Sequence, residues 1–312
     1  ITTSGQLSIR WIEKALNIYL NKILETKNED YVIASDTDSV YITFDKFVGN
    51  VFEEGTEPSR IVAFLDKIAK ESVEPFMAKS YKALAQTMNA YEQKMEMSRE
   101  VIAGPETSTG IGGIWTAKNR YILNVWDSEG VRYKTPQLKM MGIESVKSST
   151  PAPCREKLKQ ALNIIMGGDE KMLNTFIQEF RNEFMKLPPE EIAYPRSCNG
   201  LEKFKGESSL FATGAPIHVK GSILYNYLLD KEKLEGKYEK IQNGDKIRFL
   251  HMKQPNIYQS SAFSFMTKIP RELDIVDKID YTTQFDKSFS EPLRFITAVS
   301  YTHLTLPTNR EV

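Results

Sequence analysis

Several features that define common protein classes are scarce or missing in this 312-residue sequence. Its two cysteines, Cys154 and Cys198, are too few for a disulfide scaffold and are typical of free thiols in a reducing compartment. No apolar run approaches the ~18 residues of a membrane-spanning helix, and no signal-peptide pattern is seen. Basic and acidic residues balance at 41 each, which argues against a generally basic nucleic-acid binder but allows a local basic stripe.

The beginning of the sequence is also unusual. It opens with Ile1 rather than Met, directly in helix-like sequence. This leads us to expect a fragment of a longer protein.

Hydrophobic periodicity in the first part of the chain predicts helices with a hairpin between them. Apolar residues at three- and four-residue steps predict a helix over residues 4–25 and a second helical stretch from Pro58 to about Tyr91, with a break near Pro75. Short β-branched and aromatic runs at 31–34 and 40–44 predict the hairpin.

The remaining chain is predicted to hold strands, then helices, then a mixed region. Alternation and glycines predict strands from Met95 to Gly142, with a hairpin turn at Ser128-Glu129-Gly130. Helices are predicted over 152–187, ended by Pro188-Pro189, and the pattern from about residue 200 onward is mixed. The predicted fold class is therefore α+β.

Two aspartates stand close together in the predicted hairpin, in Asp36-Thr37-Asp38-Ser39. In extended backbone, carboxylates two residues apart point to the same face, and the flanking apolar strands predict that the pair is buried beneath a sheet. Neighbouring anions repel unless a cation lies beside them, and a hard ion such as Mg²⁺ suits carboxylate oxygens. The alternative is an ordinary turn, which Asp and Ser favour without any ligand.

Other patterns exclude two common classes of site. Gly110-Ile111-Gly112-Gly113 lacks the spacing of a dinucleotide-binding loop and does not lie in a βαβ unit. The three histidines, His218, His251 and His303, are far apart in sequence and lack zinc-site spacing. Between Ile114 and Thr150, six basic residues face three acidic ones, which makes this segment a local basic region.

Several strings in this sequence resemble family B DNA polymerases, in particular the replicative polymerases of T-even-type bacteriophages. The hairpin string Val32–Tyr41 resembles their motif C, although Ala34-Ser35 stands where the family usually has Tyr-Gly. The resemblance runs from about residue 1 to about 297. The other strings that carry it, in the family's order, are Ala103–Pro105, Gly110–Tyr121, Leu123–Asp127, Lys139–Gly142, Lys147–Pro151 and Pro216–Gly221.

The resemblance implies an architecture and a reaction. Residues 1–142 are expected to form part of a polymerase palm, and 143–297 a mainly helical thumb. The reaction is template-directed transfer of dNTPs to a primer 3′-OH, in which two Mg²⁺ ions clamp the attacking and leaving oxygens. By resemblance, Asp38 is a metal ligand, Asp36 a supporting carboxylate near the primer end, and Glu100 a further palm carboxylate, whose alternative is a surface glutamate in a strand.

The resemblance also implies DNA contacts in both parts of the chain. Lys118-Asn119-Arg120-Tyr121 is expected to begin a strand, where the family has Lys-Lys-Arg-Tyr along the minor groove. The alternatives are a solvated strand edge and ordinary surface residues. The full set of expected DNA-contact residues is Thr37, Lys118, Asn119, Arg120, Tyr121, Lys147, Ser148, His218 and Lys220.

The implied partners are primer–template DNA, dNTPs and, in the complete enzyme, a sliding clamp. The implied location is the cytoplasm of an infected bacterium, and no membrane partner is expected. The exonuclease, fingers and upstream palm of the family are not in this sequence, so we expect the chain to be inactive alone. The alternatives are the C-terminal DNA-binding subunit of a split polymerase and an unrelated divalent-cation enzyme that uses Asp36 and Asp38. Residues 298–312 resemble a translated sequencing adapter and are expected to be a non-native tail; the alternative is a genuine terminal tail.

Overall fold

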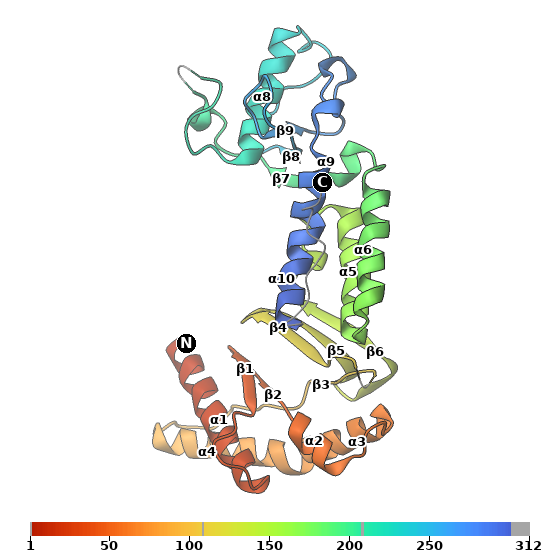
Figure 1. Ribbon diagram of the computed structural model, residues 1–312. Coiled ribbons are helices and arrows are strands. Elements are labelled where there is room, and N and C mark those ends of the chain that lie inside the picture. Colours follow the sequence, from red (N-terminus) through yellow and green to blue (C-terminus); the bar gives the residue numbers. More distant parts are fainter. Residues whose placement is uncertain (1, 108, 207–208, 301–312) are drawn as a thin grey trace. The chain divides into compact units, whose positions relative to one another are not determined.

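The computed structural model describes residues 2–107, 109–206 and 209–300 and divides the chain into two compact units (Figure 1). Unit 1 comprises residues 1–142 with 166–168, and unit 2 comprises residues 143–165 with 169–312. Both units combine helices with antiparallel strands, which confirms the α+β class. In the described ranges, no helix is both long enough and apolar enough to cross a membrane.

Unit 1 contains the predicted helices and hairpin, with one helix that the periodicity did not indicate. That helix is α2, which follows the hairpin directly and is too short for a repeat of apolar residues to appear. The helices are α1 (Thr2–Ile23), α2 (Asp45–Val51), α3 (Pro58–Ile68) and α4 (Glu74–Thr87). The strands are β1 (Val32–Asp36), β2 (Ser39–Ile42), β3 (Val101–Ala103), β4 (Gly113–Ala117), β5 (Arg120–Ser128) and β6 (Val131–Met141).

A π-helical turn, Ala69–Val73, joins α3 to α4 at the predicted break near Pro75. Proline has no N–H, and in a regular α-helix its ring clashes with the carbonyl four residues earlier. The wider turn immediately before Pro75 is consistent with relief of that clash. The helical stretch therefore continues through the proline instead of ending there.

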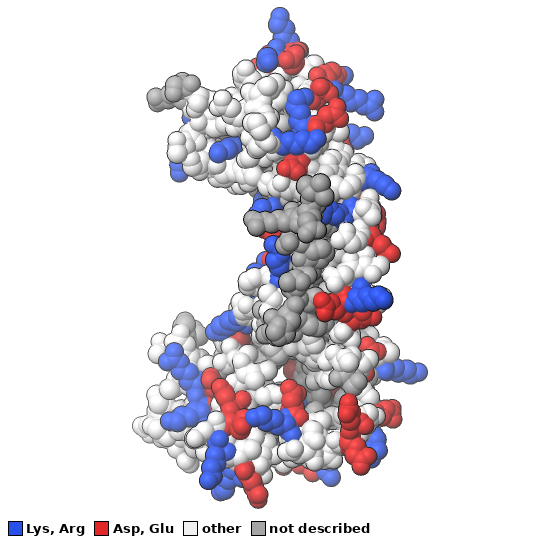
Figure 2. Space-filling view, viewed as in Figure 1, with Lys and Arg blue, Asp and Glu red and all other residues white. Residues whose placement is uncertain are grey.

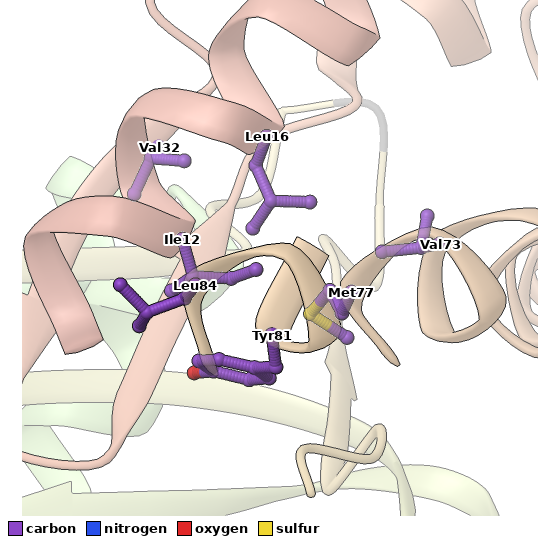
Figure 3. Close-up of a cluster of buried hydrophobic side chains, with 7 residues drawn as sticks. All are labelled: Ile12, Leu16, Val32, Val73, Met77, Tyr81 and Leu84. Atoms are coloured by element: carbon purple, nitrogen blue, oxygen red, sulfur yellow. The ribbon is translucent and has the colours of Figure 1, made fainter. Parts of the chain in front are cut away.

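The main core of unit 1 lies where α1 crosses α4 (Figure 3). Its periodic apolar residues come from one face of each helix and from the start of β1. The buried members of this cluster are Ile12, Leu16, Val32, Val73, Met77, Tyr81 and Leu84. A second cluster joins Val62 of α3 to Ile102 of β3 and Trp126 of β5.

Two separate antiparallel sheets follow from the strand pairing in unit 1. Among the described strands, β1 and β2 pair only with each other, whereas β5 pairs with β3, β4 and β6. The turn between β5 and β6 has positive φ at Glu129 (51°) and Gly130 (88°), as the Ser128-Glu129-Gly130 pattern predicted. The strand predicted to begin at Met95 is wrong, because residues 92–100 are irregular and β3 begins at Val101.

Unit 2 combines a small sheet, on which α8 packs, with further helices. The predicted stop at Pro188-Pro189 ends the preceding helices but also begins α7, because Pro189 occupies a first helical turn, where no N–H is needed. The α-helices are α5 (Ala152–Gly167), α6 (Glu170–Phe184), α7 (Pro189–Ile192), α8 (Ile217–Lys231), α9 (Tyr281–Phe285) and α10 (Glu291–Ser300). Strands β7 (Tyr194–Ser197), β8 (Lys246–His251) and β9 (Ala262–Phe265) form the sheet, in that order.

Shorter helical turns complete unit 2. The 3₁₀ turns are Glu144–Val146, Glu202–Phe204, Arg271–Leu273 and Val276–Lys278, and Asp286–Ser290 is a π-helical turn between α9 and α10. Aromatic rings from α6, α9 and this π turn form one part of the core; they are Phe180, Phe184, Phe285 and Phe289. Of the predicted foreign tail, residues 298–300 continue α10, and residues 301–312 lie outside the described residues.

Candidate catalytic hairpin and DNA-contact residues

The carboxylate hairpin forms as predicted, but its two aspartates do not share one extended strand. Asp36 ends β1 and pairs with Ser39 of β2, so that Thr37 and Asp38 form the turn. The prediction that the pair lies buried beneath a sheet is wrong: Asp36 is half-buried and Asp38 is exposed. The reason is that the hairpin is a two-stranded ladder, and its turn extends past the residues that pack against the core.

Local hydrogen bonds and a nearby lysine favour the charged form of Asp36. Its Oδ1 accepts from the backbone N–H of Thr37 at 2.8 Å and from the Thr37 hydroxyl at 3.2 Å, and it lies 3.7 Å from Lys118 Nζ. The Thr37 N–H is the largest of the causes that lower the pKa of Asp36 below its ordinary value, and Lys118 adds to it. At neutral pH, Asp36 therefore presents a carboxylate with one side open to solvent.

The chemistry of this turn suits a hard cation, but the donor set is small. Carboxylate oxygens are the ligands that Mg²⁺ prefers, and Mg²⁺ usually keeps several waters beside one or two carboxylates. Within the part of the chain that the structure describes, no three His, Cys, Asp or Glu side chains lie close enough together to hold a metal ion. The hairpin can therefore contribute one or two carboxylate ligands to a metal site.

Glu100 is held by a lysine of the neighbouring sheet. It follows the irregular segment before β3, and its carboxylate pairs with Lys139 of β6 at 2.5 Å. This ion pair attaches Glu100 to β6, and its expected place near the hairpin carboxylates stays a prediction.

The basic segment occupies a second hairpin turn. Lys118 and Asn119 form the turn between β4 and β5, so the prediction that they begin a strand is wrong, and only Arg120 and Tyr121 do so. The side chain of Lys118 is 70% exposed, which leaves it accessible to a ligand. Tyr121 is only 6% exposed, and a buried ring offers little surface for the direct DNA contact expected of it.

An aromatic cluster links the two turns. The Tyr41 ring, from β2, lies 5.4 Å from the rings of both Trp115 on β4 and Tyr121 on β5. Burial, followed by the hydrogen bond with Tyr121, raises the pKa of Tyr41 to about 12. These contacts place the carboxylate turn beside the basic turn, which is why Lys118 reaches Asp36.

The expected DNA-contact residues of unit 2 lie at two places. Lys147 and Ser148 precede α5, where Lys147 pairs with Glu144 at 2.9 Å and Ser148 is exposed. His218 and Lys220 lie in the first turn of α8. Burial lowers the pKa of His218, and the positive charge of Arg196 lowers it further.

Unit 1 also contains an ionic cluster that the hydrophobic periodicity of the sequence did not predict. Arg99, which is 10% exposed, donates to Asp127 of β5 and, at 2.8 Å, to Asp66 of α3. Arg132 of β6 reaches both carboxylates, at 3.3 Å and 3.4 Å. The one signal in the sequence was Asp127, a charged residue at the end of the apolar run 121–126, because a buried charge requires a partner.

Comparison with known proteins supports the resemblance. The chain is 35% identical over 307 residues to a DNA-directed DNA polymerase of Escherichia phage RB69, a match that covers 96% of this chain and 33% of the relative. It is 33% identical over 299 residues to a DNA-directed DNA polymerase of Enterobacteria phage T4, covering 94% of this chain and 33% of that relative. The chain is homologous to phage DNA polymerases. It spans about a third of their length, and no protein-family model matches it.

Proposed function

We propose that this chain forms part of the palm, as unit 1, and the thumb, as unit 2, of a phage-type DNA polymerase. It would add dNTPs to the 3′ end of a primer–template in the cytoplasm of an infected bacterium and, in the complete enzyme, engage a sliding clamp. The observation that supports this most directly is the 35% identity over 96% of the chain, which includes the Asp36–Ser39 hairpin. If the hairpin were an ordinary turn without a catalytic role, the sequence on both sides of it would not have to resemble a polymerase.

Within this proposal, the hairpin supplies carboxylates to the metal site. Asp38, exposed in the turn, would be a direct ligand, and Asp36, held by Thr37 and Lys118, would support the primer end. Two Mg²⁺ ions bound here would stabilise the charge that develops on the attacking and leaving oxygens. Because Mg²⁺ usually binds one or two carboxylates, the other ligands would be waters, substrate phosphates or carboxylates of the rest of the enzyme. Glu100, paired with Lys139, would then act near this site rather than as a ligand.

The DNA would lie against the basic turn. Lys118 can neutralise a phosphate, whereas Asn119 can donate to acceptors in the minor groove without adding charge. Tyr121 would support this turn from beneath through its contacts with Tyr41. In unit 2, Lys147, Ser148, His218 and Lys220 would contact backbone phosphates.

A chimera tests this function. Residues 1–300 of this chain would replace the matching third of the phage RB69 polymerase, and primer extension would be measured with Mg²⁺. We expect extension by the chimera, a loss of at least about a thousandfold on Asp38→Asn because a charged ligand is removed, and no extension by the isolated 312-residue chain. A folded chimera that binds DNA without extending primers, or an active Asp38→Asn chimera, would contradict the assignment.

A further inference from the structure

The sequence contains two Asn-Gly pairs, and both lie in turns of unit 2. Asn199-Gly200 follows β7, and Asn243-Gly244 precedes β8, the strand that pairs with β7. Asparagine is one of the chemically labile residues of proteins. It is most labile before glycine, because the missing Cβ leaves the glycine nitrogen open to approach by the asparagine side chain. With the same reacting atoms in both pairs, the contacts made in the fold decide which pair reacts faster.

The Asn243-Gly244 pair is held at both of its reacting groups. The side-chain oxygen of Asn243 accepts from the backbone N–H of Leu201 at 2.9 Å. The N–H of Gly244 donates to the carbonyl of Cys198 at 2.7 Å. The first contact fixes the orientation of the amide group, and the second keeps the proton on the nitrogen that would have to attack it. Both contacts must open before this pair can react.

The Asn199-Gly200 pair lacks these constraints. Asn199 is exposed, and in the described ranges its side chain makes no hydrogen bond and the Gly200 N–H has no acceptor. Gly200 has a φ of 81°, in the left-handed region that L side chains rarely adopt. A Cβ at this position would also lie 3.2 Å from the ring of Phe204. The fold therefore requires the glycine that makes Asn199 reactive.

The main chain on either side of Asn199 is anchored. The N–H of Cys198 donates to the carbonyl of Asp245 at 2.8 Å, and the carbonyl of Gly200 accepts from the N–H of Phe204 at 3.2 Å. These bonds hold the turn in place at both ends. The asparagine side chain and the glycine nitrogen between them are left free to meet.

From these contacts we propose that Asn199 is a site of spontaneous deamidation in the folded chain, whereas Asn243 is protected. The Gly200 nitrogen loses its proton to water and attacks Cγ of Asn199. The new bond from this nitrogen to Cγ closes a succinimide ring, the bond from Cγ to the amide nitrogen breaks, and ammonia leaves with protons taken from water. A second water then opens the ring on either side of its nitrogen and gives aspartate or isoaspartate.

The reaction consumes one water and releases one ammonia, with no oxidation or reduction. It uses only this chain and its solvent, so it is independent of the proposed function. Both products add one carboxylate to the exposed turn after β7. Isoaspartate also places one additional carbon in the main chain between Cys198 and Gly200.

Ageing of the purified 312-residue chain in mildly alkaline buffer tests the proposal. Peptide mass spectrometry would follow each Asn-Gly pair by the gain of about 1 Da that accompanies the change from amide to carboxyl. We expect Asn199 to convert at least about tenfold faster than Asn243, because two hydrogen bonds of the second pair must open first. An aspartate-specific protease would distinguish the products, since it cleaves at aspartate and leaves isoaspartate intact.

The same ageing in concentrated urea separates the effect of the fold from that of the local sequence. Unfolding removes the contacts of Asn243, so the two rates should then agree within about threefold. In the folded chain, Asn199→Gln should remove the main acidic form seen on ion exchange. Asn163→Gln is the matched control: it replaces another exposed asparagine, which is followed by isoleucine, and should leave the rate unchanged. Circular dichroism would verify that both variants are folded.

Three outcomes would overturn the proposal. In the folded chain, Asn243 could convert as fast as Asn199, which would show that its hydrogen bonds give no protection. Asn199 could keep its amide in the folded chain while it reacts in urea, which would show that the turn prevents the attack. A lead of tenfold for Asn199 that persists in urea would show that the neighbouring sequence, and not the fold, sets the difference.

Discussion

Asp36 illustrates how local contacts can favour the charged form of a carboxylate with little burial. The hydrogen bonds come from the next residue, and the nearby cation comes from the turn between β4 and β5. A carboxylate that is already charged is ready to attract a metal ion over the whole physiological pH range. The interaction with Lys118 is solvent-exposed, so salt should weaken it more than the backbone hydrogen bond.

Replacing Lys118 should therefore raise the pKa of Asp36. In Lys118→Met, the Coulombic and hydrogen-bond contributions of the lysine disappear, and the pKa moves upward toward the ordinary value of 3.8. It should stay below that value, because the Thr37 N–H still donates. A carbon-13 NMR titration of the aspartate carboxyl groups would measure the shift, with Lys134→Met on β6 as a control. An unchanged Asp36 pKa in Lys118→Met would show that the two side chains do not interact in solution.

Arg99 is expected to contribute more to stability than the exposed ion pairs of the described residues, because it and its partner Asp127 are buried. Its removal leaves Asp127, whose side chain is 1% exposed, with Arg132 as the remaining partner. Removing one partner of a buried ion pair costs about 3–5 kcal/mol of stability. Because Arg132 still pairs with Asp127, the loss should lie near the lower end of this range.

We thus expect Arg99→Met to lower the free energy of unfolding by about 3 kcal/mol. Lys46→Met, which breaks the exposed pair with Glu29, should cost less than about 1 kcal/mol. Urea titrations of both variants would give the two values. Equal losses in the two variants would mean that solvent screens the Arg99 cluster as fully as a surface pair.

At the scale of elements, sequence patterns predicted which segments are regular but not how neighbouring segments are placed. The hairpin was predicted because two β-branched runs surround a polar tetrad. The exposure of Asp38 was missed because it depends on the register in which Asp36 pairs with Ser39. The partner of Glu100 was equally hidden, since Lys139 reaches it only through the pairing of β6 with β5.

The sheet of unit 2 should be sensitive to acid through its histidines. Burial lowers the pKa of both His251 on β8 and His218 on α8, so the folded state favours the neutral rings. The unfolded chain binds protons below the ordinary histidine value of 6.5, and the folded chain does so only at lower pH. Stability should therefore decrease as pH falls below about 6.5.

Replacing one ring should reduce this pH dependence. In His251→Phe, the protonation penalty at position 251 is removed, so the loss of stability between pH 7 and pH 5 should be smaller than in the wild-type chain. Thermal unfolding of the variant and of the wild-type chain, followed across this range, would measure it. A pH profile of His251→Phe identical to that of the wild type would contradict the sign or the cause of the shift.

At the scale of the whole molecule, the even balance of charge limits how DNA can be bound. On the face drawn in Figure 2, basic and acidic side chains are interspersed, in keeping with 41 of each in the sequence. Under the proposed function, affinity for DNA would then come from local cations that displace counterions, such as Lys118. Binding should be weak and independent of base sequence.

The dependence of binding on salt tests this directly. Each neutralised phosphate contributes about 0.9 to the slope of log affinity against log salt. Lys118→Ala should lower the slope by roughly one and weaken binding about equally on all sequences. Asn119→Ala should leave the slope nearly unchanged, because an amide releases no counterion. If Lys118→Ala changes neither slope nor affinity, the basic turn is a solvated edge and does not contact DNA.

The π-helical turn at Ala69–Val73 bears on how the family's sequences should be aligned. A π turn accommodates one residue more than an α turn between the same flanking helices. Here Val62 of α3 packs on Trp126, whereas Val73 and the apolar face of α4 pack on α1. The helical stretch from α3 to α4 thus packs against two clusters of buried residues. The π turn sets how far the apolar face of α4 is rotated about the helix axis relative to that of α3. Relatives without proline at position 75 should tolerate a one-residue deletion between 69 and 73, so a single gap is expected there while the core positions on both sides stay aligned.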